Sequence, residues 1–135
     1  MTSHRRSALL LGLVWLVDGC SGGLDRLGPT AIDEGVVLYV HANFVGSSQQ
    51  IATDVPDLSA VEGPCGGGDE SSPTWNDCVS SIRVLPGWGA TLYGDKRFKG
   101  ATLTVTADVP DLKAVTGECS RSFNDCLSSI KVYRR

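Results

Sequence analysis

A ten-residue pattern that occurs twice is the feature that most limits the folds open to this chain. The first copy, residues 75–84, reads WNDCVSSIRV, and the second, residues 123–132, reads FNDCLSSIKV. Both copies run aromatic, Asn, Asp, Cys, aliphatic, Ser, Ser, Ile, basic, Val, so every position is matched in chemical type. Two matched copies in 135 residues indicate that the folded part is built from a duplicated unit.

The duplication extends upstream of these two stretches. An offset of 54 residues places the segment DVPDL at 54–58 on its second copy at 108–112, and Cys65 on Cys119. After those cysteines the offset falls to 48, because the first copy carries six extra residues in a stretch rich in Gly, Asp, Ser and Pro at 66–74. An insertion confined between matched flanks predicts a surface loop.

Short apolar runs separated by turn residues predict an all-β fold. Val36, Leu38 and Val40 alternate with other residues, as do Ile130 and Val132, and no long stretch has a helical period. Two similar four-strand units packed face to face would bury both apolar faces, which predicts a β-sandwich. The two DVPDL segments are expected to form a turn or one short helical turn.

These motifs resemble those of the βγ-crystallin superfamily. Residues 39–46 and 93–100 read Tyr-x4-Phe-x-Gly, which is similar to the folded-hairpin signature of that family's Greek-key motifs. Residues 76–81 and 124–129 read Asn-Asp-x-x-Ser-Ser, which is similar to its microbial calcium-binding motif. The resemblance implies a βγ-crystallin-like β-sandwich of two Greek-key motifs, motif one at about 36–85 and motif two at about 90–134.

The folded hairpins need particular residues. Gly46 and Gly100 are expected to adopt a positive φ cheaply where each hairpin folds back over its sheet. Two aromatic pairs are expected to pack beneath the folds as aromatic corners: Tyr39 with Phe44, and Tyr93 with Phe98.

The resemblance also implies a pair of calcium sites. Calcium takes about six to eight oxygen ligands, and one Asn-Asp-x-x-Ser stretch offers too few to close a site alone. In the family each stretch contributes to two ions, and a carbonyl from the folded hairpin completes each site. The expected side-chain ligands are Asn76, Asp77, Ser80, Asn124, Asp125 and Ser128, and the expected backbone carbonyls are those of Cys78, Cys126, Val40 and Gly94.

The same residues also have an interpretation without metal. Asn and Asp cap turns, and paired serines bond backbone groups where a strand begins. In the family, Ser81 and Ser129 look structural in this way and hold the folded hairpin. Relatives that lose calcium typically carry a basic residue at the first serine of the motif, and here Ser80 and Ser128 are both intact.

Four cysteines occupy equivalent places in the two copies. Four cysteines allow three pairings, and the duplication favours either Cys65–Cys78 with Cys119–Cys126 or the two cross-copy pairs. We expect the local pairs, because each closes a loop inside one unit. Zinc binding is the rival interpretation, but four cysteines in an exported chain favour disulfides.

The N-terminus predicts export. His4, Arg5 and Arg6 precede an apolar run at 8–17, which is typical of a secretory signal and too short to span a bilayer. Residues 16–20, LVDGC, resemble a bacterial lipobox in which Cys20 would be lipidated, although Asp18 departs from that pattern. We therefore expect a signal at 1–20, a flexible tether at 21–35 and a domain at 36–135, in a secreted protein or a cell-envelope lipoprotein.

Composition and charge exclude some classes of function. The net charge is −3 and no basic patch is evident, so nucleic acid is not an expected partner and the membrane would be contacted only through a lipid anchor. Neither His4 nor His41 lies in a pattern with a nucleophile, so we do not expect an enzyme.

The favoured function is a calcium-binding domain with a structural role, whose further partner would be an envelope or extracellular protein or a glycan. Two other hypotheses stay open. One is a small disulfide-bearing proteinase inhibitor that docks residues 66–74 in a protease cleft. The other is an envelope adhesion or carbohydrate-binding module.

Overall fold

The computed structural model describes residues 33–66, 73–117, 119 and 121–135. Seven strands and three one-turn 3-10 helices follow one another in these ranges: β1 (Val36–His41), η2 (Ala42–Phe44), β2 (Val45–Ile51), η3 (Leu58–Ala60), β3 (Glu62–Cys65), β4 (Ser81–Val84), β5 (Trp88–Asp95), β6 (Lys99–Val105), η4 (Leu112–Ala114) and β7 (Ser129–Arg134). The predicted all-β class is confirmed. Within these ranges no helix has the length and apolar character that crossing a membrane requires. The predicted signal, Cys20, most of the tether and residues 67–72 of the predicted loop lie outside the described residues.

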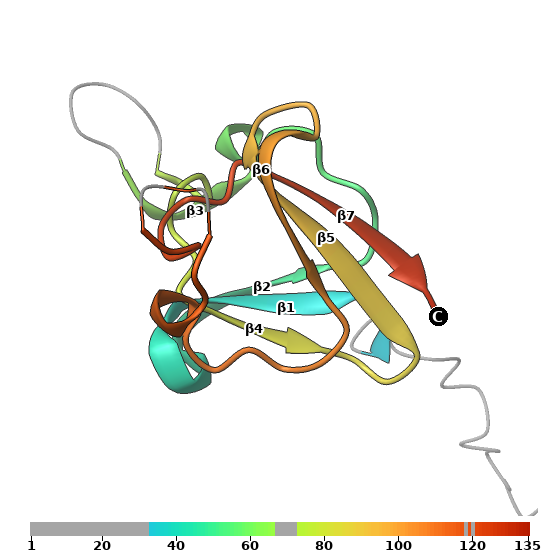
Figure 1. The fold of residues 1–135 in the computed structure, drawn as a ribbon. Coiled ribbons are helices and arrows are strands. Elements are labelled where there is room, and N and C mark those ends of the chain that lie inside the picture. The colour runs from blue at the N-terminus through green and yellow to red at the C-terminus, as the bar shows by residue number, and fades with distance from the viewer. Residues whose placement is uncertain (1–32, 67–72, 118, 120) are drawn as a thin grey trace, which may run out of the picture.

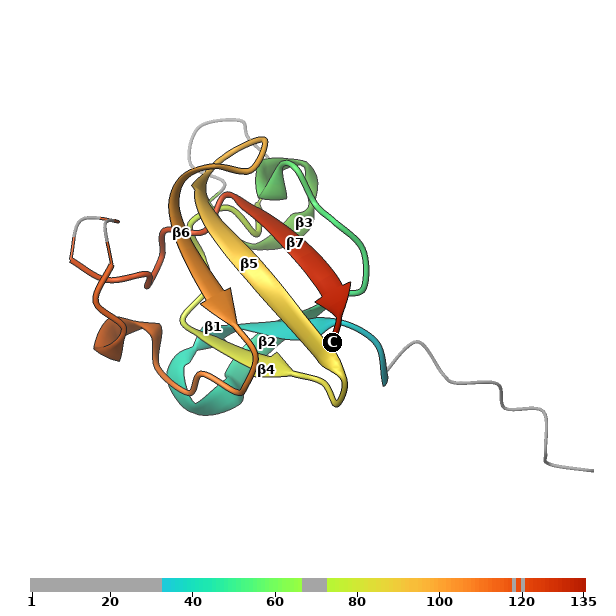
Figure 2. The same cartoon turned by 45° about the vertical axis from the view of Figure 1, so that its right-hand side comes forward.

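Six of the strands form two antiparallel three-stranded sheets that face one another, and β3 forms only isolated bridges with Thr74. The strand orders of the sheets are β2-β1-β4 and β6-β5-β7, and in both views the strands of one sheet run obliquely to those of the other (Figures 1 and 2). The two sheets repeat the same register, since Leu38 pairs with Gln49 in the first and Leu92 pairs with Leu103 in the second. The duplication of the sequence is therefore a duplication of the sheet.

The core lies between these sheets and draws equally on both copies. Leu38 and Ile82 of the first sheet and Leu92 and Ile130 of the second have no exposed surface. Trp75 and Phe123, the first residues of the two repeated stretches, are each 2% exposed. The matched apolar positions of the two copies thus fill one shared interior.

A short extended segment of each copy pairs with the sheet of the other copy. Val55 forms an antiparallel bridge with Ile130, and Val109 forms one with Ile82. Each bridge consists of two reciprocal N–H···O bonds of 2.8 and 2.9 Å. This exchange differs from the expectation that each copy forms a four-strand unit of its own, because each sheet has three strands and the segment that bridges to its edge comes from the other copy.

The repetition of the DVPDL segment in both copies has a structural reason. Asp54 accepts a hydrogen bond from the Val132 N–H at 2.9 Å, and Asp108 accepts one from the Val84 N–H at 2.8 Å. The segment is therefore extended in its first half. Its second half leads directly into η3 or η4, so the expected short helical turn is confirmed for that half alone.

The folded hairpins are held by aromatic packing. The Tyr39 and Phe44 rings meet edge to face with centroids 5.8 Å apart, and the second copy repeats this arrangement at 5.6 Å. Gly46 and Gly100 have φ values of 86° and 78°, which confirms their expected role. Phe44 also has a φ of 61°, a left-handed conformation that is uncommon for a bulky residue.

Two buried serines stabilise this strained backbone. Ser81 Oγ accepts a hydrogen bond from the Phe44 N–H at 3.0 Å and donates one to the His41 carbonyl at 2.6 Å. Ser129 does the same for Phe98 and Asp95, with the same two distances. Both serines are fully buried, and the structural role expected for them is confirmed.

Replacing Ser129 with Ala should destabilise the domain by about 1–2 kcal/mol, because it leaves a partly buried N–H and a partly buried carbonyl without their partner. Urea unfolding in calcium-free buffer measures this loss without any contribution from metal. Thr106→Ala, at an exposed position, is the matched control and should change stability by less than about 0.5 kcal/mol. Equal stability of Ser129→Ala and the control would show that the hairpin does not depend on this hydroxyl.

Candidate metal centre

The two stretches predicted to bind calcium lie side by side. We call residues 76–80 and 124–128 the first and second clamp. Asp77 N–H donates to the Leu127 carbonyl at 3.0 Å, and Asp125 N–H donates to the Val79 carbonyl at 3.1 Å. Each clamp therefore holds the other through reciprocal backbone bonds. The chain that leads into β7 lies at the end of the sandwich away from the C-terminus (Figure 1).

Part of the Asn-Asp pattern serves the local turn. Asp77 and Asp125 both have a φ of 52°, in the left-handed region that Asp and Asn tolerate better than most residues. Asn76 Nδ2 donates to Asp77 Oδ2 at 2.6 Å, and Asn124 Nδ2 donates to Asp125 Oδ2 in the same way. The interpretation without metal accounts for these contacts.

The interpretation without metal leaves one atom in each clamp unexplained. The side-chain oxygens Asn76 Oδ1 and Asn124 Oδ1 are buried and accept no hydrogen bond from the part of the chain that the structure describes. A buried acceptor without a partner costs about 1–3 kcal/mol. The same orphaned oxygen occurs at the same position of both copies, and a cation would satisfy it.

Each clamp is also fastened to a folded hairpin. Ser80 N–H donates to the Tyr39 carbonyl at 2.9 Å, and Ser128 N–H donates to the Tyr93 carbonyl at 3.0 Å. Tyr39 and Tyr93 directly precede Val40 and Gly94, the residues expected to offer backbone carbonyls. The clamp serines are thereby brought next to those residues in both copies.

A cavity of about 400 Å³ lies where groups from both copies meet. Its lining consists of Asp77, Gly94, Cys119, Asn124, Asp125 and Cys126. Apart from Cys119, all of these were expected at the metal. The structure therefore gathers one carboxylate of the first clamp with the second clamp and the second hairpin.

The electrostatics of this cavity favour a cation. Burial raises the pKa of the Asp77 carboxyl above its ordinary value, and the negative charge of Asp125 acts in the same direction. The hydrogen bond from Asn76 and the charge of Lys96 oppose this rise in pKa. Two carboxylates that repel one another beside orphaned amide oxygens make a site that lacks positive charge.

The donor set matches calcium better than zinc. Among the described residues, no group of three or more His, Cys, Asp and Glu side chains is placed to hold a metal. Any site here must complete the Asp77 and Asp125 carboxylates with amide, hydroxyl and carbonyl oxygens, which are ligands that calcium accepts. The zinc interpretation fails because the cysteines it requires are paired with one another.

The disulfides are the local pairs. Cys65 pairs with Cys78 and Cys119 with Cys126, with Cα–Cα distances of 5.7 and 6.1 Å, so the expected pairing is confirmed over the cross-copy alternative. The second disulfide packs on the cavity wall. A Cβ atom at Gly94 would lie 2.9 Å from Cys119 Sγ, so glycine at this position leaves room for the bridge.

Comparisons with known proteins identify relatives of the chain. No protein-family model matches it. Spherulin-3A from Physarum polycephalum is 34% identical over 97 residues, which is 72% of this chain and 80% of that protein. A structure solved in a study of the evolution of the eye-lens βγ-crystallin domain fold is 30% identical, with a TM-score of 0.59 over 76% of this chain and 88% of its own. A βγ-crystallin domain from Flavobacterium johnsoniae is 26% identical, with a TM-score of 0.55 over 74% of this chain and 94% of its own.

Asp77→Asn should stabilise the metal-free domain at pH 7. A carboxyl whose pKa is raised on folding contributes stability that is present at low pH and is lost as pH rises through the folded-state pKa. The amide keeps the left-handed turn and carries no charge, so the gain should shrink as pH falls and the wild-type carboxyl is protonated. Thermal melts in EDTA at pH 7 and pH 4 measure both effects.

Asp57→Asn is the matched control with the opposite sign. Its pKa is lowered, first by the hydrogen bond from the Ser59 side chain and also by Lys96. This carboxylate contributes stability above its unfolded-state pKa and loses it as pH falls, so the variant should be less stable than wild type at pH 7. If Asp77→Asn also lowers the melting temperature at pH 7 in EDTA, the charge of the Asp77 carboxylate does not destabilise the metal-free domain.

Proposed function

The chain belongs to the βγ-crystallin superfamily, and we propose that its domain binds two calcium ions at the clamps and has a structural role. The observation that carries this proposal is the pair of buried, unpartnered oxygens, Asn76 Oδ1 and Asn124 Oδ1. They lie next to Asp77 and Asp125, whose charges repel one another. A turn without metal requires neither feature.

The cavity supports a division of the ligands between two sites. One set comprises Asp77 of the first clamp with Asn124, Asp125, Gly94 and Cys126, which line one cavity. The duplication relates this set to a second one. Its members are Asp125 with Asn76, Asp77, Val40 and Cys78. Ser80 and Ser128, which are 8% and 7% exposed, add one hydroxyl at each clamp.

Calcium, when bound, supplies the positive charge that both carboxylates lack. Binding at the clamps would stabilise the whole domain, because each clamp precedes a core strand and is hydrogen-bonded to the other copy. A ligand present at 100 times its dissociation constant stabilises the native state by about 2.7 kcal/mol. Small domains are stable by about 5–15 kcal/mol in total, so the contribution is substantial.

The proposal includes no catalytic role. His41, the one histidine among the described residues, is exposed, and its backbone carbonyl rather than its ring takes part in the hairpin. The proteinase-inhibitor hypothesis rests on residues 66–74, of which 67–72 lie outside the described residues. No observation favours that hypothesis over calcium binding.

We also propose that the protein is exported, either secreted or anchored through Cys20. The two disulfides fit an oxidising compartment. Cell fractionation tests the anchor, since Cys20→Ser should move an acylated protein out of the membrane fraction. Wild-type protein that is already soluble would eliminate the anchor and leave secretion.

Calorimetric titration of the full chain with calcium should show two bound ions and a melting temperature raised by several degrees. Ser128→Arg should abolish at least one site, because it removes a hydroxyl ligand and places a cation where a cation binds. Thr106→Arg adds the same charge at an exposed position and should bind two ions. Absence of heat up to 10 mM calcium on oxidised protein, or unchanged binding by Ser128→Arg, would refute the assignment.

A further inference from the structure

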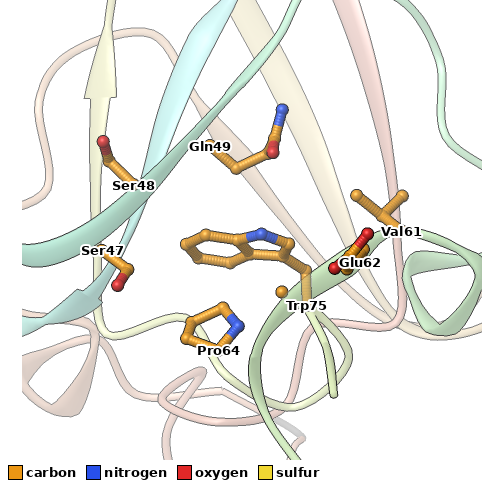
Figure 3. Close-up of a pocket in the computed structure, with 8 residues that line it drawn as sticks. Ser47, Ser48, Gln49, Val61, Glu62, Pro64 and Trp75 are labelled. Carbon is orange, nitrogen blue, oxygen red and sulfur yellow. The ribbon is translucent and has the colours of Figure 1, made fainter. Parts of the chain in front are cut away.

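A second cavity, of about 640 Å³, lies beside the edge strand β2. It is lined by Ser47, Ser48 and Gln49 of β2, by Val61, Glu62, Gly63 and Pro64, and by Trp75. Figure 3 shows the Trp75 indole between Gln49 and Pro64, with the two serines to one side. We call this cavity the β2 groove, and we propose that it binds a neutral saccharide.

The second copy of the duplicated unit shows what this region looks like when it serves packing alone. Ala101 and Leu103 occupy the places of Ser47 and Gln49, and both pack against the core. Leu103 pairs with the buried Leu92, just as Gln49 pairs with the buried Leu38. Residues paired across two strands point to the same face of a sheet, so Gln49 points toward the core side.

The first copy therefore carries polar side chains, Ser47 and Gln49, on the inner face of edge strand β2, where the second copy carries apolar ones on β6. Exchanging partly buried apolar side chains for an amide and a hydroxyl sacrifices hydrophobic stabilisation. Departures from a local packing rule are expected at functional sites. Three further differences cluster at the same groove. They are Glu62 in place of Thr116, Pro64 in place of Glu118, and Trp75 in place of Phe123.

The groups in the β2 groove are mainly hydrogen-bond acceptors. Gln49 Nε2 uses one of its two N–H groups to donate to the Gln50 carbonyl at 2.9 Å, which leaves Oε1 and one N–H to bind a ligand. The Glu62 side chain is exposed and forms no ion pair within the described ranges. Together with the Ser47 and Ser48 hydroxyls, these oxygens suit a ligand that presents several O–H donors. A saccharide has that chemistry.

Trp75 forms a rigid floor rather than a stacking platform. It is 2% exposed, and a Cβ atom at Gly63 would lie 2.5 Å from its Cδ1, so the ring sits directly on the Gly63 backbone. The saccharide hydroxyl groups would therefore bind the polar side chains around Trp75, namely those of Ser47, Gln49 and Glu62. The volume lies within the range of small-molecule sites, about 300–1,000 Å³.

An extended peptide is the alternative occupant, because β2 is an edge strand and its backbone could accept another strand. However, β6 is the matching edge strand of the second sheet and offers the same backbone. Strand addition would not explain why the two copies differ in side chains on the inner face. The difference between the copies favours a ligand that is bound by side chains.

The test begins with the full chain on an array of neutral oligosaccharides, followed by calorimetry with the sugar that binds best. Each sugar is offered free and linked to a carrier protein, which distinguishes a soluble oligosaccharide from a surface glycan. The double variant Ser47→Ala/Gln49→Leu copies the second copy of the unit and should lose at least about tenfold in affinity. Its melting temperature should stay equal to that of wild type or rise, because apolar burial increases.

Thr104→Ala, on the exposed face of β6, is the matched control and should bind the sugar like wild type. Asp77→Asn should also bind it, which separates this proposal from the calcium sites. The proposal is overturned if no sugar on the array binds, or if the double variant binds as tightly as wild type. A peptide library hit that protects β2 amides from exchange equally in wild type and the double variant would instead establish strand addition.

Discussion

The backbone hydrogen bonds that cross between the two copies are the interaction on which the rest of this structure depends. Val55 and Val109 each complete the sheet of the other copy. The backbone N–H of the turn residue Asn43 donates to the Pro110 carbonyl at 2.6 Å, and that of its counterpart Arg97 donates to the Pro56 carbonyl at 2.7 Å. The two clamps are joined by a further reciprocal pair. Neither copy can therefore satisfy its sheet, its hairpin or its clamp without the other, and the duplicated units fold as one domain.

This interdependence places the proposed metal centre where a bound ion would contact both copies. Ser80 O and Ser128 O accept hydrogen bonds from Leu112 N–H and Leu58 N–H of the opposite copy, each at 2.9 Å. A clamp residue thus contacts its own hairpin through its N–H and the other copy through its carbonyl. Positive charge at the clamps would neutralise Asp77 and Asp125 at the junction of the two copies, so it would stabilise the packing of both sheets.

Residue spacing alone predicted features that are repeated locally, whereas contacts with partners distant in sequence were predicted only where the family resemblance implied them. The aromatic corners and the local disulfides follow from residues that recur at fixed spacing. The role of Ser129, whose partners Phe98 and Asp95 lie 31 and 34 residues away, was an expectation drawn from resemblance. The pairing of Val55 with the sheet of the other copy could not be predicted from its apolar side chain. An apolar side chain indicates burial but does not indicate which sheet covers it. The left-handed conformation of Phe44 was missed for a similar reason, since its stabilising partner, Ser81, lies 37 residues away. The gathering of the calcium ligands was an expectation drawn from resemblance, which the spacing within one clamp could not supply.

The two copies also provide an internal comparison that separates scaffold from specialised sites. The clamps match in chemical type, as the proposed calcium sites require of both copies, whereas the edge strands β2 and β6 differ at Gln49 and Leu103, as the proposed saccharide site requires of one copy. The β2 groove and the first clamp are nevertheless adjacent in the chain, since Trp75 directly precedes Asn76. Trp75 N–H donates to the Val61 carbonyl at 3.1 Å, and Val61 lines the same groove. Trp75 is already buried without metal, so the two proposed sites share a boundary in the chain while each should bind its ligand on its own; any effect of one ligand on the affinity for the other must be reciprocal.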